Sequence, residues 1–244
     1  MEQCRAVRLL FVGDVVGSPG RRALAALLPG LREAHRPDWV VVNGENAAGG
    51  IGINAKIARE MLDDLSVDAI TLGNHAYRHR DVYEFLDNDE RIVRPSNYPK
   101  GNPGQGHTIV TKGDTRLAVV NLSGTVFLDA ARSPFAEADA ILAELREQAE
   151  HVLVDFHAEA TSEKVAMGWH LDGRVTACVG THTHVPTADG RVLPGGTAYI
   201  TDVGMTGARG GVIGVRREQS IAVMRTHMPQ RYDPARRTRG STRC

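Results

Sequence analysis

The stretch that decides the fold is residues 39–50, Trp-Val-Val-Val-Asn-Gly-Glu-Asn-Ala-Ala-Gly-Gly. Its apolar start, residues 39–42, predicts a β-strand buried on both faces. The strand runs into a cluster of oxygen donors, residues 43–46, and the glycines beyond it allow a tight turn. A carboxylate at the end of a buried strand is costly unless a positive charge meets it, and Arg36 is the only Lys or Arg within nine positions of Glu45. We therefore expect Glu45 to meet metal cations, and its two oxygens can bridge two of them.

Four other apolar runs also end in residues that can bind a metal ion. The five endings are Asp14, Glu45-Asn46, Asn74-His75, His157 and His182-Thr183-His184. In open α/β sheets the carboxyl ends of the strands share one rim, and ligands bind there. Any one of these histidines by itself is as well explained by a structural role. The recurrence of the pattern at five strand ends predicts a shared metal site.

The order of predicted elements indicates an α/β protein. Alternating strands and helices over residues 7–93 predict parallel pairing, and a hairpin over residues 107–122 predicts antiparallel additions. Helices are expected to cover the outer faces of two stacked sheets. We expect a helix over residues 21–35 that breaks or kinks near Pro29, and a helix capped by Asn54. Late strands are expected at residues 192–193, 198–201, 212–215 and 221–224.

Length and composition narrow the class of protein. The 244 residues suit one large domain, which we place at residues 1–226, followed by an arginine-rich tail, residues 227–244, expected to be disordered. The formal charge of zero argues against extended nucleic acid or a membrane surface as partner. Three scattered cysteines form no disulfide or zinc pattern, and no apolar stretch approaches the roughly 18 residues of a membrane span. We expect a cytoplasmic protein with a small substrate, and a homo-oligomer is left open.

Local geometry separates ligands from a proton donor. In an extended segment residues i and i+2 point the same way, so His182 and His184 can face one cavity. Neighbours such as Asn74 and His75 point apart, so we assign Asn74 as a ligand and His75 as a free general acid, with an intrinsic pKa of about 6.5. Carboxylate, amide and imidazole ligands without thiolate suit Mn, Fe or Zn. Two such ions can clamp a displacement at phosphorus and lower the pKa of a bridging water, which attacks as hydroxide.

These motifs resemble a known family. Gly13-Asp14, Gly44-Glu45-Asn46, Gly73-Asn74-His75, His157 and residues 180–184 (Gly-Thr-His-Thr-His) look like the calcineurin-like metallophosphoesterase superfamily. Residues 155–164 (Asp-Phe-His-Ala-Glu-Ala-Thr-Ser-Glu-Lys) and 193–205 narrow the resemblance to its YmdB-like branch, the bacterial cyclic-nucleotide phosphodiesterases. Asn46 takes the place of the histidine that most of the superfamily carries after its first strand, which is a feature of that branch. Ala76-Tyr77 departs from the Thr-Trp of many relatives, which bears on the substrate pocket.

The resemblance implies a fold, a ligand set and an activity. The fold would be a four-layer α/β/β/α sandwich of two mixed sheets. One metal ion, iron or manganese with zinc as a further candidate, would be held by Asp14, Glu45, Asn46 and His184. The other would be held by Glu45, Asn74, His157 and His182, with His75 as general acid. The implied reaction is hydrolysis of phosphodiesters, including 2′,3′-cyclic nucleotides, to the 3′-nucleotide.

Two other classes of protein share parts of this pattern. A nucleotide-binding Rossmann domain is disfavoured because Gly13, Gly17 and Gly20 give G-x-x-x-G-x-x-G and Asp14 would repel a pyrophosphate. A regulatory metal-binding module with little turnover remains the alternative, and completeness of the ligand set argues against it. Cations near the motifs, among them Arg94 and Lys164, are interpreted as solvated surface charges.

Overall fold

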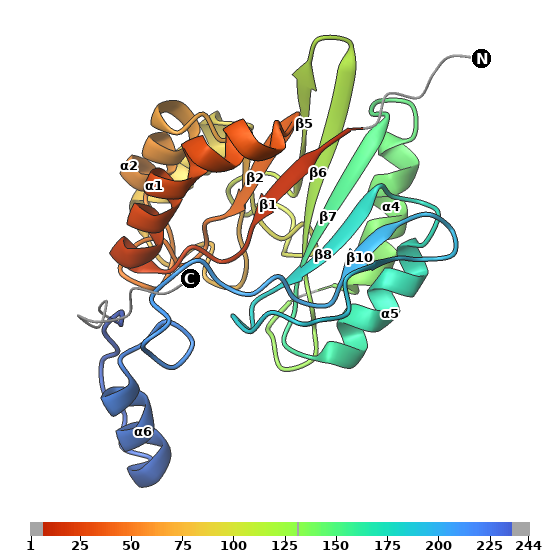
Figure 1. The fold of residues 1–244 in the computed structure, drawn as a ribbon. Helices are drawn as coiled ribbons and strands as arrows, with labels where there is room; N and C mark the ends of the chain where they lie inside the picture. Colours follow the sequence, from red (N-terminus) through yellow and green to blue (C-terminus); the bar gives the residue numbers. More distant parts are fainter. Residues whose placement is uncertain (1–6, 131, 236–244) are drawn as a thin grey trace.

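The computed structural model describes residues 7–130 and 132–235, and its strands form two sheets (Figure 1). The first sheet has the order β1-β2-β3-β4 and is parallel throughout. Its strands are β1 (Leu9–Val12), β2 (Trp39–Asn43), β3 (Ala69–Thr71) and β4 (Ile92–Val93). The parallel pairing predicted for the first half of the chain is therefore confirmed.

The second sheet has the order β5-β6-β7-β8-β10-β9 and is the mixed one. Its strands are β5 (His107–Lys112), β6 (Thr115–Ser123), β7 (His151–His157), β8 (Ala177–Thr181), β9 (Arg191–Val192) and β10 (Ala198–Ile200). The β5–β6 hairpin is antiparallel, as predicted, and β6, β7, β8 and β10 run parallel to one another. Only this sheet contains both parallel and antiparallel strand pairs. The predicted sandwich of two mixed sheets therefore consists of one parallel sheet and one mixed sheet.

Helices cover the outer faces of both sheets (Figure 1). They are α1 (Gly17–His35), α2 (Ala55–Arg59) with a π-helical turn (Glu60–Asp64), a 3₁₀ turn (Arg80–Val82) with α3 (Tyr83–Asn88), α4 (Pro134–Leu145) and α5 (Thr161–Leu171). A further helix, α6 (Arg217–Thr226), covers neither sheet. The Asn54 side chain accepts a hydrogen bond from the Ile57 N–H at 2.9 Å, so Asn54 caps α2 as expected. The helix α1 continues past Pro29 to His35 and does not break there.

Three apolar clusters separate the four layers. Along β2 the side chains alternate: Val40 and Val42 pack under the helices of the first sheet, while Trp39 and Val41 face the second sheet. The middle cluster lies between the sheets, and a third, which includes Phe156, lies between the second sheet and the helices α4 and α5. This order of helix, sheet, sheet and helix confirms the predicted sandwich.

Two late strands predicted from the sequence are wrong. Residues 221–224 lie within α6, which projects from the body of the molecule (Figure 1). Residues 212–215 form a tight turn in which Val212 and Val215 exchange backbone hydrogen bonds of 2.9 Å. Short apolar runs do not by themselves distinguish strand from helix.

The predicted tail is only partly within the described residues. Residues 227–235 return from α6 to the body, where Ala235 is 2% exposed and Pro234 pairs with Val215. Residues 236–244, for which disorder is also predicted, lie outside the described residues. Across residues 7–130 and 132–235, no helix combines the length and the apolar character that crossing a bilayer requires.

Cys178 of β8 allows a test of whether reagents in solution can reach the interior of the second sheet. Its thiol is buried against the core under α5, and burial, with a contribution from Asp155, raises its pKa to about 12. In a Cys4→Ser, Cys244→Ser chain we expect 5,5′-dithiobis(2-nitrobenzoate) at about pH 8 to leave Cys178 unmodified, because the thiolate is the reactive form. The same reagent should label it readily in urea. Equal labelling rates in both conditions would show that β8 is accessible in the folded protein.

Candidate metal centre

The candidate site lies where strand ends of the two sheets meet. β1, β2 and β3 of the first sheet lead into Asp14, Glu45-Asn46 and Asn74-His75, and β7 and β8 of the second lead into His157 and His182-Thr183-His184. Hydrogen bonds and ion pairs connect all eight predicted site residues into one cluster. The convergence predicted from the strand endings is thus what the structure contains, although the role of each residue is a separate question.

Glu45 is the centre of this cluster. It is 1% exposed, and its Oε1 lies 3.3 Å from Nε2 of His157 and 3.3 Å from Nδ1 of His75. The same oxygen accepts a hydrogen bond of 2.9 Å from the side-chain amide of Asn46, while Oε2 accepts one of 3.2 Å from the backbone N–H of His75. The carboxylate therefore touches groups from both halves of the site.

One half of the site gathers around His157. Its Nε2 lies 3.0 Å from Oδ1 of Asn74 and 3.0 Å from Nδ1 of His182, besides its contact with Glu45. Ligand atoms of Glu45, His157 and His182 all lie within 4.8 Å of one another, which is the spacing that a single bound ion needs. Four donor atoms thus point at one small volume.

The other half gathers around Asp14, which is 0% exposed at the end of β1. Its Oδ1 lies 3.6 Å from Nε2 of His184, and that same nitrogen lies 3.1 Å from the side-chain amide of Asn46. Asn46 presents its amide nitrogen here; a rotation of the amide would present its oxygen instead. Glu45 borders this half through its hydrogen bond with Asn46.

Each of the three histidines expected to be metal ligands, His157, His182 and His184, is held by its outer nitrogen. Nδ1 of His157 lies 2.9 Å from the Thr181 hydroxyl, which itself donates to Asp155, so Nδ1 carries the proton in this bond. Nδ1 of His184 donates to the carbonyl oxygen of Ile213 at 2.8 Å. Nε2 of His182 lies 2.9 Å from the carboxylate of Glu159. The inner nitrogens are left to face the cluster, as in metal-binding histidines whose other nitrogen is hydrogen-bonded.

Two further features fit bound cations. Within the described residues, Oδ1 of Asp14 is a buried acceptor without a hydrogen-bond donor, which is costly unless a positive charge meets it. Gly73 lies directly against the cluster: a Cβ there would come within 2.2 Å of Glu45 Oε2 and 2.3 Å of His157 Nε2. The donor set of oxygen and imidazole nitrogen suits a first-row transition metal.

The electrostatics of the cluster agree with this fit. Burial by itself would raise the pKa of Glu45, but His157 and His75 outweigh it and hold that pKa well below its ordinary value. Burial opposes a charge on His157, yet Glu45 and Asp14 raise its pKa to about 9. Burial and the nearby His157 lower the pKa of His182 to about 4. The cluster has enough negative charge to hold an extra proton, and a bound cation would take the place of that proton.

The backbone at the two late histidines differs from the expectation. His182 and His184 have φ angles of +99° and +66°, so the segment is not extended, although both rings reach the cluster. Asp202 holds this turn, because its Oδ2 accepts hydrogen bonds from the N–H of Thr183 at 3.2 Å and from its hydroxyl at 2.8 Å. Lys164, 1% exposed, pairs with the same oxygen at 2.6 Å.

Other details of the sequence interpretation are corrected. Asn74 and His75 lie in a turn rather than in an extended segment, and their side chains touch at 3.3 Å instead of pointing apart. Lys164 is a buried ion-pair partner, and Arg94, 7% exposed, donates to the carbonyl oxygen of Pro95, so neither is a solvated surface charge.

Sequence reasoning missed Glu159 and Asp202. Glu159 follows His157 by two positions, and Asp202 lies within the second long string that carries the family resemblance, residues 193–205. Their positions in these strings were the available signal, but nothing in the sequence connects them with residues 182–184. Both act on that turn from other parts of the chain.

A cavity of about 320 Å³ opens over the cluster. Its polar side is lined by Glu45, Asn46, His75, Glu159, His182, Thr183 and His184. This volume is in the range of small-ligand sites. The cavity therefore gives a small substrate access to the candidate metal centre.

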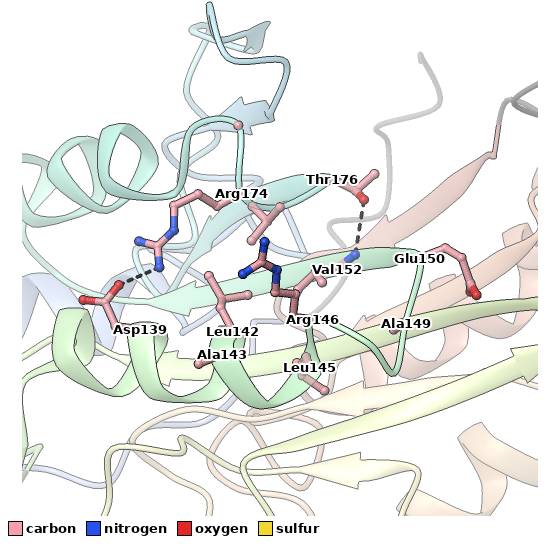
Figure 2. A pocket seen from close by; sticks show the side chains of 12 residues that line it. Asp139, Leu142, Ala143, Leu145, Arg146, Ala149, Glu150, Val152, Arg174 and Thr176 are labelled. Carbon is pink, nitrogen blue, oxygen red and sulfur yellow. Dashed lines mark hydrogen bonds and ion pairs between the residues drawn. The ribbon is translucent and has the colours of Figure 1, made fainter.

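A larger cavity, of about 620 Å³, lies elsewhere, between α4 and the start of β7 and β8 (Figure 2). Its lining includes Asp139 and Arg174, which form an ion pair with 2.7 Å between Oδ1 of Asp139 and a guanidinium nitrogen of Arg174. Apolar residues, among them Leu142 and Val152, also line it. None of the clustered site residues lines it. This cavity is the larger of the two, but the clustered metal-competent side chains line the smaller one, and we therefore place the candidate site there.

The chain is similar to known proteins in both its sequence and its structure. The family model described as "YmdB-like protein" matches residues 10–242. The chain is 48% identical over 229 residues to a 2′,3′-cyclic-nucleotide 2′-phosphodiesterase of Bacillus subtilis (strain 168), covering 94% of this chain and 86% of the relative. A solved structure of a hypothetical protein from Thermus thermophilus matches with a TM-score of 0.88 and 47% identity, over 94% of this chain and 88% of that one. A novel phosphatase from Mycoplasma pneumoniae matches with a TM-score of 0.88 and 37% identity, over 96% and 84% of the two chains.

Gly73 allows a test of the cluster in which none of the proposed ligand residues is itself replaced. We expect Gly73→Ala to weaken Mn²⁺ binding by about tenfold or more, since its Cβ would displace Glu45 and His157. The matched control is Gly30→Ala in α1, where a Cβ meets nothing within 4 Å, and it should bind metal normally. Elemental analysis and calorimetric titration measure the outcome. Unchanged binding in Gly73→Ala would contradict a metal site at this position.

Proposed function

The chain belongs to the YmdB-like family, and from this premise we propose that it is a metal-dependent phosphodiesterase acting on 2′,3′-cyclic nucleotides. The observation that supports it most is the convergence of oxygen and imidazole donors from five strand ends on the buried carboxylate of Glu45. The named activity of the Bacillus subtilis relative supplies the substrate class.

We assign the ligands by position in the cluster. On this proposal one cation is held by Asp14, Glu45, Asn46 and His184, and the other by Glu45, Asn74, His157 and His182. Two divalent cations held in this way would supply charge stabilisation at the phosphoryl oxygens and would lower the pKa of an attacking water. Carboxylate, amide and imidazole donors favour iron or manganese, with zinc also suited.

The protein's own groups orient the ester and move protons. Oxygen from water adds to phosphorus, the P–O2′ bond breaks, and O2′ leaves with a proton, which gives the 3′-nucleotide. We assign the donor of that proton as His75, whose side chain is 33% exposed beside the cavity. Its Nδ1 faces Oε1 of Glu45 at 3.3 Å and Oδ1 of Asn46 at 3.1 Å. Its Nε2 lies 3.3 Å from the side-chain amide nitrogen of Asn74, and on this proposal Nε2 exchanges that contact for the substrate when it passes on a proton.

Purified protein loaded with Mn²⁺ tests the function directly. We expect hydrolysis of bis(p-nitrophenyl) phosphate and of 2′,3′-cyclic AMP, with the 3′-nucleotide as product. A fully loaded protein that hydrolyses neither would favour a regulatory metal-binding module over an enzyme. Metal analysis of the protein as purified, before loading, identifies the resident ions.

Glu45→Gln tests the central ligand. The amide keeps the size of the side chain but lacks the negative charge of the carboxylate. On this proposal both cations bind that carboxylate, so metal content and activity should fall together. We expect turnover to fall by more than about 100-fold and bound metal per chain to fall with it. Wild-type metal content together with full activity would exclude Glu45 as a bridging ligand.

His75→Ala separates proton donation from metal binding. We expect this variant to keep its metal and to lose about 100-fold or more of its activity on 2′,3′-cyclic AMP, because the O2′ leaving group needs a proton. Bis(p-nitrophenyl) phosphate, with its good leaving group, should lose much less. If the metal content of His75→Ala falls as far as that of Glu45→Gln, then His75 is a ligand and the assignment is wrong.

A further inference from the structure

Two segments from the end of the chain together line part of the site cavity, and we call the pair the strap. Residues 211–216 lead into α6, and residues 230–235 return from it (Figure 1). The two segments bond to each other: the N–H of Arg216 donates to the carbonyl of Asp233 at 3.0 Å, and the N–H of Ala235 donates to that of Gly214 at 2.7 Å. Backbone hydrogen bonds therefore hold the two segments of the strap together, although neither is a strand of one of the two sheets.

The strap is anchored on the body through close backbone approaches. A Cβ at Gly17 would come within 3.0 Å of the Pro234 ring, and one at Gly50 within 3.4 Å of it. A Cβ at Gly211 would come within 2.5 Å of the buried Ala235 side chain. Glycine at these places lets the strap lie directly against the start of α1 and the loop after β2.

Ile213 connects the strap with the candidate metal centre. Its carbonyl oxygen accepts the hydrogen bond from Nδ1 of His184 that orients that ring. Its φ of +43° is unusual for a β-branched residue and marks a backbone held in place by its surroundings. The Ile213 side chain is 49% exposed and lines the cavity. One residue thus aims a candidate ligand and forms part of the cavity wall.

The cavity has two chemically different sides. The candidate metal centre makes one side polar. The other side is lined mainly by apolar residues, Ile51 with strap residues Ile213, Val215, Tyr232 and Pro234, and also by Asp233, whose carboxylate accepts a hydrogen bond from Gln219 at 3.0 Å. Among the described lining residues, Tyr232 is the one Phe, Tyr or Trp, and the residue is 41% exposed. Within the described part of the chain its hydroxyl makes no hydrogen bond.

We propose that Tyr232 is the stacking platform for the nucleobase of the substrate, which makes the strap the specificity-determining element of the site. The inference rests on the proposed function, which puts the phosphate on the polar side of the cavity. A cyclic nucleotide has one anionic group and one flat aromatic group, and this cavity offers a matching surface to each. Stacking on an aromatic ring accepts any base, so the proposal predicts selectivity for nucleotides over esters without a base, with little choice among bases.

The test compares two cyclic phosphates that differ in the base. 2′,3′-Cyclic AMP and glycerol 1,2-cyclic phosphate have the same five-membered ester ring, and only the first has an aromatic group. We expect Tyr232→Ala to lower kcat/KM for 2′,3′-cyclic AMP by about tenfold, mainly through KM, and to leave that for the glycerol ester within about twofold. Tyr232→Phe should retain the wild-type preference, because it keeps the ring. Trp169→Ala, which removes an exposed aromatic ring outside the cavity, is the matched control.

Binding of 3′-AMP to the Mn²⁺-loaded chain, followed by calorimetry, is measured in parallel. If the wild-type chain hydrolyses neither ester, the proposed function is overturned. The inference about Tyr232 is then decided by whether Tyr232→Ala weakens 3′-AMP binding by about tenfold. If both esters are hydrolysed and their ratio is the same in wild type and Tyr232→Ala, Tyr232 is not the platform, whatever the metals do. Wild-type binding of 3′-AMP by Tyr232→Ala would overturn the inference in the same way.

Discussion

The burial of the Glu45 carboxylate is the constraint on which the rest of the site depends. Moving an isolated carboxylate into an apolar interior costs many kcal/mol, so a folded chain must bring compensating groups to it. Here the compensation comes from both sheets, with His157 from the second sheet and His75 and Asn46 from the first. The site therefore cannot form until the two sheets have packed, and its geometry is set by how they meet.

A buried polar connection fixes that meeting. Asp155, two residues before His157 on β7, accepts hydrogen bonds from Asn43 of β2 at 2.9 Å and from Thr181 of β8 at 2.6 Å. Burial raises the pKa of Asp155 to about 6, an effect that these donors partly offset. Because Asn43 also ends the strand that leads to Glu45, the same bonds that join the sheets hold His157 over the carboxylate. A displacement of one sheet would leave several of these buried groups without partners, at about 1–3 kcal/mol each.

Much of the fold follows from local pattern. The continuous apolar runs of β2 and β7 are typical of strands buried on both faces, and Asn54 signals its helix by the capping bond that it makes. Residues 221–224 show where such reasoning stops. Their apolar side chains suit a strand or a helix, and in the structure they lie in α6, which projects from the body of the molecule.

The sequence by itself determined which side chains gather at the site. Glu45 and His157 follow buried parallel strands, and the carboxyl ends of such strands share a rim whatever the loops do. Only the tertiary structure decided how the rings are aimed, because periodicity predicts direction in extended segments alone and His182 and His184 lie in left-handed conformations. Their outer partners, Glu159 and the carbonyl of Ile213, come from other segments of the chain. Contacts of that kind arise from packing, which a local pattern does not contain.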